Sequence, residues 1–135
     1  MRNPASDFTA VTDLLHVYFD GLYYADSQRL AQVLHQDARY INTVDGNYIN
    51  LSRNAYFAVV DQRQSPASNK EIRSDEILAV EFGGPNLAFA KVRLVMMGRL
   101  YTDFLTLFFG EGQWWIISKV FAYKQAPEES QNAIC

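Results

Sequence analysis

The sequence predicts an α+β fold in which three helices lie on the concave face of a curved, mostly antiparallel sheet. Apolar residues recur at helical spacing only before Pro66. In residues 70–124 the apolar residues instead follow the two-residue period of strands. Residues 98–124 are rich in aromatic and β-branched residues around a glycine-containing turn, which is typical of a long hairpin. We expect a single domain over residues 1–135, with a core of about 7–124 and a flexible tail over 125–135.

The first helix is expected over residues 8–25, with Ser6 and Asp7 as its cap. Its apolar positions form one stripe, which comprises Phe8, Val11, Leu15, Tyr18 and Leu22. His16 falls on the opposite, outer face. Gly21 weakens this helix by about 1 kcal/mol relative to alanine, so close approach of another backbone would be a reason to keep it.

Two more helices and a short hairpin follow. Asp26 is expected to cap a short second helix that ends at residues 35–37. Residues 38–44 and 47–51 read as strands joined by a turn at Asp45-Gly46. Ser52 is expected to cap a third helix over residues 53–64.

The remaining strands are expected over residues 70–82, 87–97 and on either side of the turn at 110–112. Alternation slips at Ile77-Leu78, which indicates a bulge. A three-residue turn in the last hairpin would pair Asp103 with Lys119 and Leu107 with Trp115. Alternation would then place Trp115 on one face with Asp103 and Lys119, and Trp114 on the other.

Both faces of this hairpin are apolar, so each needs a cover. Helices can cover one face, and an exposed apolar patch of such a size usually marks an interface. We therefore predict a homodimer that packs sheet to sheet through a symmetric contact. The alternative is a monomer in which sheet curvature and the tail over residues 126–135 cover the outer face.

The composition excludes several classes of function. A net charge of -3 without a basic cluster argues against nucleic-acid binding. The single cysteine, Cys135, cannot form an internal disulfide and suggests a reducing compartment. Neither a signal peptide nor a membrane span is evident, so we expect a cytoplasmic protein. His35 and Asp37 are too few ligands for a zinc site, and we expect no metal and no cofactor.

Several strings resemble a known family, namely YFDGLYYAD (18–26), LHQDARY (34–40), YTDFLTL (101–107) and WWIISKVF (114–121), together with the turn at 45–46. Over Phe8 to Lys124 the chain resembles the "Putative lumazine-binding" family of the nuclear transport factor 2-like superfamily. The resemblance implies a conical fold with a pocket between the helices and the concave sheet face, commonly in a dimer. The superfamily includes ketosteroid isomerases, dehydratases, polyketide cyclases and non-catalytic binding proteins, so the fold does not decide the function.

Asp103 is the most informative candidate residue, because a lone carboxylate on an apolar face is costly to bury. In one interpretation burial keeps it protonated, and it donates a hydrogen bond to a ligand beside Tyr18, as an aspartate does beside a tyrosine in ketosteroid isomerase. In the other interpretation Lys119 forms a cross-strand ion pair with it. Buried charges are usually paired, which favours the ion pair.

A general base is harder to identify. The resemblance to ketosteroid isomerase places Asn42 where that chemistry needs a carboxylate, and an amide has no useful basicity. His35 could act as a base, although its expected place at a helix end is equally explained by the helix dipole. The candidates for catalysis are therefore Asp103, Tyr18 and His35.

The expected ligand pocket joins aromatic and polar side chains: Tyr18, Leu22, Tyr40, Asn42, Tyr56, Tyr101, Asp103, Trp115 and Lys119. The first hypothesis is a protein that binds a small apolar or aromatic ligand there. The alternatives are a lyase or isomerase that acts on a cyclic ketone, and a non-catalytic protein interaction module.

Overall fold

Six strands form one sheet in the order β2-β1-β6-β5-β4-β3 in the computed structural model, which describes residues 2–127. The strands are β1 (Leu34–Asn42), β2 (Ile49–Ser52), β3 (Ser74–Gly84), β4 (Leu87–Met96), β5 (Arg99–Gly110) and β6 (Gln113–Gln125). β1 and β6 are parallel and all other neighbours are antiparallel. The predicted α+β class is confirmed. Most of the predicted tail, residues 128–135, lies outside the described residues.

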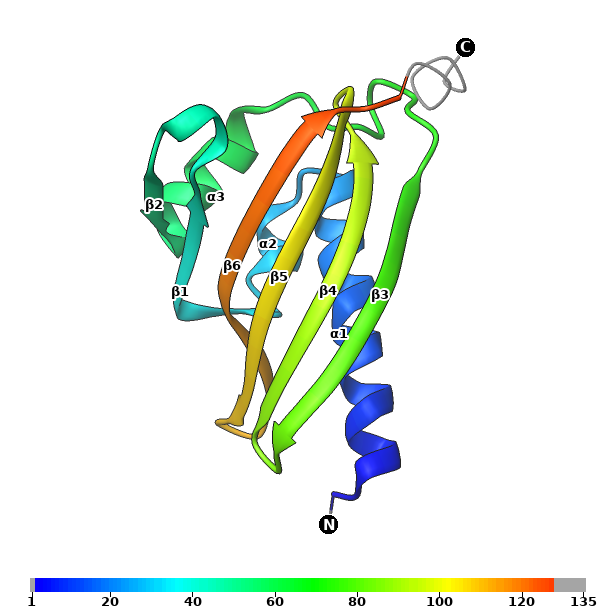
Figure 1. The fold of residues 1–135 in the computed structure, drawn as a ribbon, viewed down its shortest axis with the longest axis vertical. Coiled ribbons are helices and arrows are strands. Elements are labelled where there is room, and N and C mark those ends of the chain that lie inside the picture. Colours follow the sequence, from blue (N-terminus) through cyan, green and yellow to red (C-terminus); the bar gives the residue numbers. More distant parts are fainter. Residues whose placement is uncertain (1, 128–135) are drawn as a thin grey trace.

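Three helices accompany the sheet: α1 (Pro4–Tyr23), α2 (Ser27–Leu30) and α3 (Arg53–Gln62). Figure 1 shows α1 and α2 along one face of the curved sheet and α3 beside β1 and β2. Apolar side chains of the helices meet the same face of β4, β5 and β6 in one core, which includes Val11, Leu15, Phe19, Leu30, Val92, Leu105, Leu107 and Ile116.

The cap of α1 differs from the prediction. Asn3, not Ser6 or Asp7, caps the helix: its side chain accepts a hydrogen bond from the Ser6 N–H, and the Ser6 hydroxyl accepts one from the Asn3 N–H. Pro4 fits the first helical position because the N–H that it lacks would be unpaired there.

The helix caps at Asp26 and Ser52 are confirmed. The Asp26 side chain accepts from the Gln28 N–H at 3.0 Å, and the Ser52 hydroxyl accepts from the Ala55 N–H at 3.2 Å. Gly21 faces Leu30, because a Cβ at position 21 would lie 2.5 Å from Leu30 Cδ2 and 3.3 Å from its backbone nitrogen. The close approach of another backbone, which would be a reason to keep this glycine, is thus present and comes from α2.

Two strand boundaries and one turn also differ. β1 begins at Leu34, so His35 lies in a strand and not at the end of a helix. The turn predicted at Asp45-Gly46 is a short 3₁₀ helix over Val44–Gly46, with Asp45 at φ 58° and Gly46 at φ 79°. The bulge expected in β3 is confirmed by a register shift between Ile77 and Ala79.

The register of the β5–β6 hairpin corrects the predicted one. Gly110 pairs with Gln113, so the turn has two residues, Glu111 and Gly112, at φ 54° and 82°. Positive φ at both positions is the geometry of a hairpin turn whose twist matches the flanking strands. A second irregularity follows, since Leu107 pairs with Ile116 but Thr106 pairs with Ser118.

These two features decide which side chains face the helices. The shorter turn shifts the pairing by one residue and thereby exchanges the faces of Trp114 and Trp115. The extra residue, Ile117, then restores the predicted faces along the rest of β6. Lys119 therefore shares a face with Asp103 as predicted, although it pairs with Leu105 and not with Asp103 itself.

Candidate functional site

A polar cluster lies on the helix-facing side of the sheet, within the apolar core. Five elements contribute to it: Tyr18 from α1, Tyr40 from β1, Tyr56 from α3, Asp103 from β5 and Lys119 from β6. The exposed fraction is 0% for Tyr18, 1% for Tyr56 and Asp103, and 4% for Lys119. We call these five residues the Asp103–Lys119 cluster. All five belong to the predicted pocket.

Hydrogen bonds connect most of the cluster. The Tyr18 hydroxyl donates to Asp103 Oδ2 at 2.6 Å, and Lys119 Nζ donates to the Tyr56 hydroxyl at 3.3 Å. Lys119 Nζ lies 3.9 Å from the same Oδ2. Among residues 2–127, Asp103 Oδ1 is buried without a hydrogen-bond partner. One oxygen of the carboxylate thus faces a donor and a cation, while the other is unsatisfied.

Aromatic rings enclose the Lys119 ammonium. Tyr40 stacks on Tyr56 with ring centroids 4.4 Å apart. Lys119 Nζ lies between 5.1 and 5.7 Å from the centroids of four rings, those of Tyr18, Tyr40, Tyr56 and Phe121. Because an ammonium is attracted to the face of an aromatic ring, these rings and the carboxylate together offset the loss of hydration.

The cluster shifts the pKa values of two of its members. Burial raises the pKa of the Tyr18 phenol well above 10.0, and the charge of Asp103 raises it further. Burial acts to lower the pKa of Lys119, but Tyr56, Asp103 and Tyr40 more than compensate, so its pKa lies above the usual 10.5. At neutral pH the site therefore presents a phenol and an ammonium as donors. Both groups approach Asp103 Oδ2, which is the arrangement of a carboxylate in an ion pair.

Three more predicted pocket residues lie on the same side of the sheet or in the core beside it. Tyr101 is buried two residues before Asp103 on β5, and its ring centroid is 6.1 Å from that of Phe121. Asn42 is buried at the end of β1, where its Oδ1 accepts from the Val44 N–H at 3.2 Å. Leu22 is buried in the core near the end of α1. Asn42 thus stabilises the local backbone at the position where the resemblance to ketosteroid isomerase would require a carboxylate base.

Trp115 and His35 are not part of this cluster. Trp115 pairs with Phe108 on the other face of the sheet. The His35 ring lies against both, with centroids 5.2 Å from Phe108 and 5.4 Å from Trp115, and its Nε2 is 3.2 Å from Glu111 Oε1. The structure therefore does not bring His35 near Tyr18 or Asp103.

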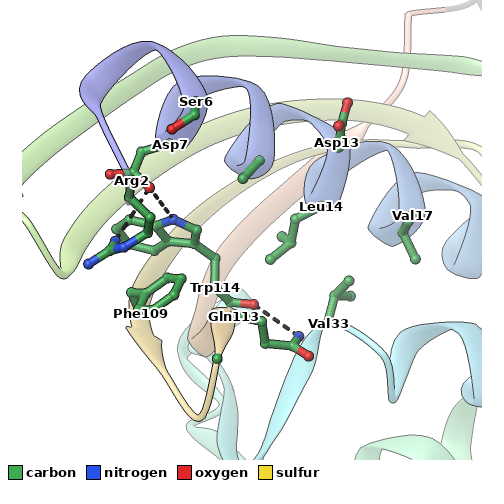
Figure 2. Close-up of a pocket in the computed structure, with 12 residues that line it drawn as sticks. Arg2, Ser6, Asp7, Asp13, Leu14, Val17, Val33, Phe109, Gln113 and Trp114 are labelled. Carbon is green, nitrogen blue, oxygen red and sulfur yellow. Dashed lines mark hydrogen bonds and ion pairs between the residues drawn. The ribbon is translucent and has the colours of Figure 1, made fainter.

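A cavity of about 570 Å³ lies beside the first half of α1 and the tip of the β5–β6 hairpin (Figure 2). Trp114 forms one wall, and its Nε1 donates to Asp7 Oδ1 at 3.3 Å. Arg2 lies over Phe109, with 3.6 Å between Cζ and the ring centroid. None of the predicted pocket residues lines this cavity. The sequence did not reveal it, because the predicted register placed Trp114 on the outer face.

Neither a metal centre nor a membrane span is evident in the part of the chain that the structure describes. Residues 2–127 contain no group of three or more His, Cys, Asp or Glu side chains that could hold a metal ion. Within the same range, no helix is sufficiently long and apolar to cross a membrane.

Solved structures share this fold. A nuclear transport factor 2-like protein of unknown function from Silicibacter pomeroyi DSS-3 aligns with a TM-score of 0.82 at 23% identity, over 91% of this chain and 100% of that one. One from Shewanella baltica OS155 gives 0.83 at 22% identity, over 93% and 100%. A cystatin-like domain of unknown function from Nostoc punctiforme PCC 73102 gives 0.72 at 16%, over 97% and 85%. The predicted nuclear transport factor 2-like fold is confirmed.

The family is also established. The sequence profile of the "Putative lumazine-binding" family matches residues 6–122, and the chain belongs to this family. A relative from Cladobotryum sp, called Aldolase FrzH, is 29% identical over 119 residues, which are 87% of this chain and 91% of that protein.

Proposed function

We propose that this protein binds a small, flat, oxygen-bearing organic molecule at the Asp103–Lys119 cluster. The family's name points to a small ligand. The observation that carries the proposal is Asp103 Oδ1, which is buried and has no hydrogen-bond partner in the described part of the chain. A buried oxygen without a partner costs about 1–3 kcal/mol, and a hydrogen-bond donor on a ligand would remove that cost.

The cluster also suggests which part of a ligand it would recognise. Asp103 Oδ1 can accept a hydrogen bond, and the Lys119 ammonium beside it can donate one. A phenol, an enol, or an N–H next to a carbonyl presents the complementary donor and acceptor. Tyr40 and Tyr56, already stacked on each other, favour a flat molecule because ring faces pack well against ring faces.

Binding of 2-naphthol, a flat phenol, tests this proposal. We expect the wild-type protein to bind it and Asp103→Asn to bind it at least about tenfold more weakly, since a charged acceptor is replaced by a neutral amide. Asp13→Asn on the exposed side of α1 makes the same chemical change away from the cluster and is the control.

Isothermal titration calorimetry measures both affinities, and circular dichroism verifies that each variant is folded. A wild-type protein that does not bind 2-naphthol contradicts the proposal. So does a folded Asp103→Asn variant with wild-type affinity.

The second candidate is an enzyme, a lyase or isomerase acting on a cyclic ketone. The relative called an aldolase favours it, because aldol reactions proceed through an enolate. The Lys119 ammonium would stabilise the enolate oxygen, and Asp103 Oδ1 would accept the proton from the adjacent carbon. Here Lys119, not a protonated Asp103, polarises the carbonyl.

Deuterium exchange distinguishes the enzyme from a binding protein. We expect an enzyme to exchange the α-protons of 2-tetralone, a flat cyclic ketone, for deuterium in D₂O, as followed by proton NMR. Asp103→Asn should abolish the enhancement over the buffer rate, and Asp13→Asn should retain it. A wild-type rate equal to that of buffer alone argues against this candidate and leaves ligand binding unaffected.

We further propose a cytoplasmic homodimer that packs through the outer face of the sheet. Phe104, Val120 and Leu87 point away from the helices there and are 49%, 43% and 48% exposed. Phe89 packs edge to face on Phe104 and extends this patch. A second copy would cover the patch with an identical one through a symmetric contact.

A further inference from the structure

Two rows of side chains lead from the Asp103–Lys119 cluster to the end of the sheet. On β5, Arg99, Tyr101 and Asp103 alternate onto the helix-facing side. On β6, Tyr123 pairs with Tyr101 and Phe121 pairs with Asp103. The ring centroids of Tyr101 and Tyr123 are 5.3 Å apart. An aromatic strip thus connects the buried carboxylate to the sheet end, where β5 begins and β6 ends (Figure 1).

Burial decreases along this strip. Asp103 and Tyr101 are buried, Tyr123 is half-buried, and Arg99 is exposed. Arg99 therefore stands at the solvent end of a row whose buried end is the unsatisfied carboxylate.

The Arg99 guanidinium is held in place by two tyrosines. Its Cζ lies 4.3 Å from the Tyr123 ring centroid, and Nη1 donates to the Tyr101 hydroxyl at 3.4 Å. Among residues 2–127, Arg99 forms no ion pair with a carboxylate. A guanidinium that rests on aromatic rings and keeps free donors is well suited to a planar oxyanion.

Charged groups lie at both ends of the strip. Lys119 and Asp103 offset each other at the buried end, which leaves Arg99 at the other end. Arg63, at the end of α3, adds a second positive charge: burial raises the pKa of Tyr40, and the charges of Lys119 and Arg63 oppose that rise. One carboxylate also lies near this sheet end, since Glu71 Oε1 accepts from the Met97 N–H at 2.8 Å, two residues before Arg99.

We propose that the ligand carries an acidic group, a carboxylate or an equivalent oxyanion, which pairs with Arg99 while its hydroxyl or carbonyl end reaches the Asp103–Lys119 cluster. This inference rests on the proposed ligand-binding function and narrows it to acidic, flat molecules. Four residues of a strand span about 13 Å, and the long Arg99 side chain shortens that distance. A fused two-ring molecule with oxygen at both ends matches the remaining length.

A matched pair of probes tests the inference in the unaltered protein. 6-Hydroxy-2-naphthoate carries a phenol at one end and a carboxylate at the other, and 6-hydroxy-2-naphthamide replaces only the carboxylate with a neutral amide. We expect calorimetry to show about tenfold tighter binding of the acid, as for one charge-assisted hydrogen-bond pair. Because the rings and the phenol are unchanged, the ratio isolates the acidic group.

Two arginine variants locate the effect. Arg99→Gln should reduce the acid-to-amide ratio to below about threefold, with the affinity for the amide unchanged. Arg39→Gln makes the same change in net charge on an exposed β1 side chain that contacts Asn50, and it should keep the wild-type ratio.

The outcomes separate the two proposals. Equal affinity for acid and amide in the wild-type protein overturns the acidic-ligand inference alone. An unchanged ratio in folded Arg99→Gln overturns the assignment to Arg99. Failure of both probes to bind, or amide binding that Asp103→Asn does not weaken, overturns the ligand-binding proposal itself.

Discussion

Replacing Lys119 with methionine is expected to destabilise the protein strongly, because the substitution leaves the Asp103 carboxylate buried without its cation. Both side chains are almost completely buried, so water replaces the lost partner poorly. Removing one member of a buried ion pair costs about 3–5 kcal/mol. A domain of ordinary stability has about 5–15 kcal/mol in total, so the variant is expected to lose a large part of it.

The double variant Lys119→Met/Asp103→Leu gives the sharper comparison. Replacing both charges with apolar side chains of similar size is often neutral or stabilising by about 1–4 kcal/mol. Tyr18 then loses the acceptor of its 2.6 Å hydrogen bond, which costs about 1–3 kcal/mol. These contributions nearly cancel, so we expect the double variant to lie within about 2 kcal/mol of wild type.

Urea unfolding, followed by tryptophan fluorescence and circular dichroism, measures all three free energies. The two signals must give the same midpoint for the comparison to hold. A double variant no more stable than Lys119→Met alone would refute the reasoning, because the cluster would then stabilise the fold through contacts that apolar side chains cannot replace.

The remaining predictions concern alkaline pH, one glycine and the outer sheet face. The pKa values of Tyr18 and Lys119 are raised above their usual 10.0 and 10.5. Their contribution to stability is therefore fully present below about pH 10 and is lost as the pH rises through the folded-state values. A urea midpoint that stays constant up to about pH 11 contradicts this prediction. Gly21→Ala should lower the free energy of unfolding by about 1–3 kcal/mol through overlap with Leu30, and a higher melting temperature would show that α2 moves aside without cost. Phe104→Lys should convert a dimer into a monomer in native mass spectrometry, whereas a wild-type monomer at concentrations well above those in the cell excludes the dimer.

The helices could largely be predicted because their caps depend on residues close in sequence. Asp26 and Ser52 each accept from a backbone N–H within three positions. The start of α1 was missed because Asn3 and Ser6 bond reciprocally around Pro4, which places the cap before the proline. His35 was misplaced for a different reason: its strand is defined by pairing with β6, which is distant in sequence.

The hairpin register could not be predicted because it depends on two local departures from regularity. Glu111 adopts a positive φ although it is not glycine, and Ile117 is an extra residue in β6. The two-residue turn exchanges the faces predicted for Trp114 and Trp115. The extra residue Ile117 returns Lys119 and Phe121 to the faces that were predicted for them. The predicted register therefore paired the wrong residues, but it correctly placed Asp103 and Lys119 on the same face of the sheet.

The unpaired oxygen of Asp103 favours a functional over a structural origin for the cluster. A structural ion pair is expected to satisfy both carboxylate oxygens, because each unsatisfied one reduces stability. Here Tyr18 and Lys119 both approach Oδ2, and Oδ1 has no partner among residues 2–127. Apolar residues of similar volume would fill the same space without that cost. What they would not provide is a fixed acceptor next to a fixed cation, with an aromatic strip that leads from both to Arg99. Under the ligand-binding proposal, a donor on the ligand would satisfy Oδ1 and remove the cost of leaving it unpaired.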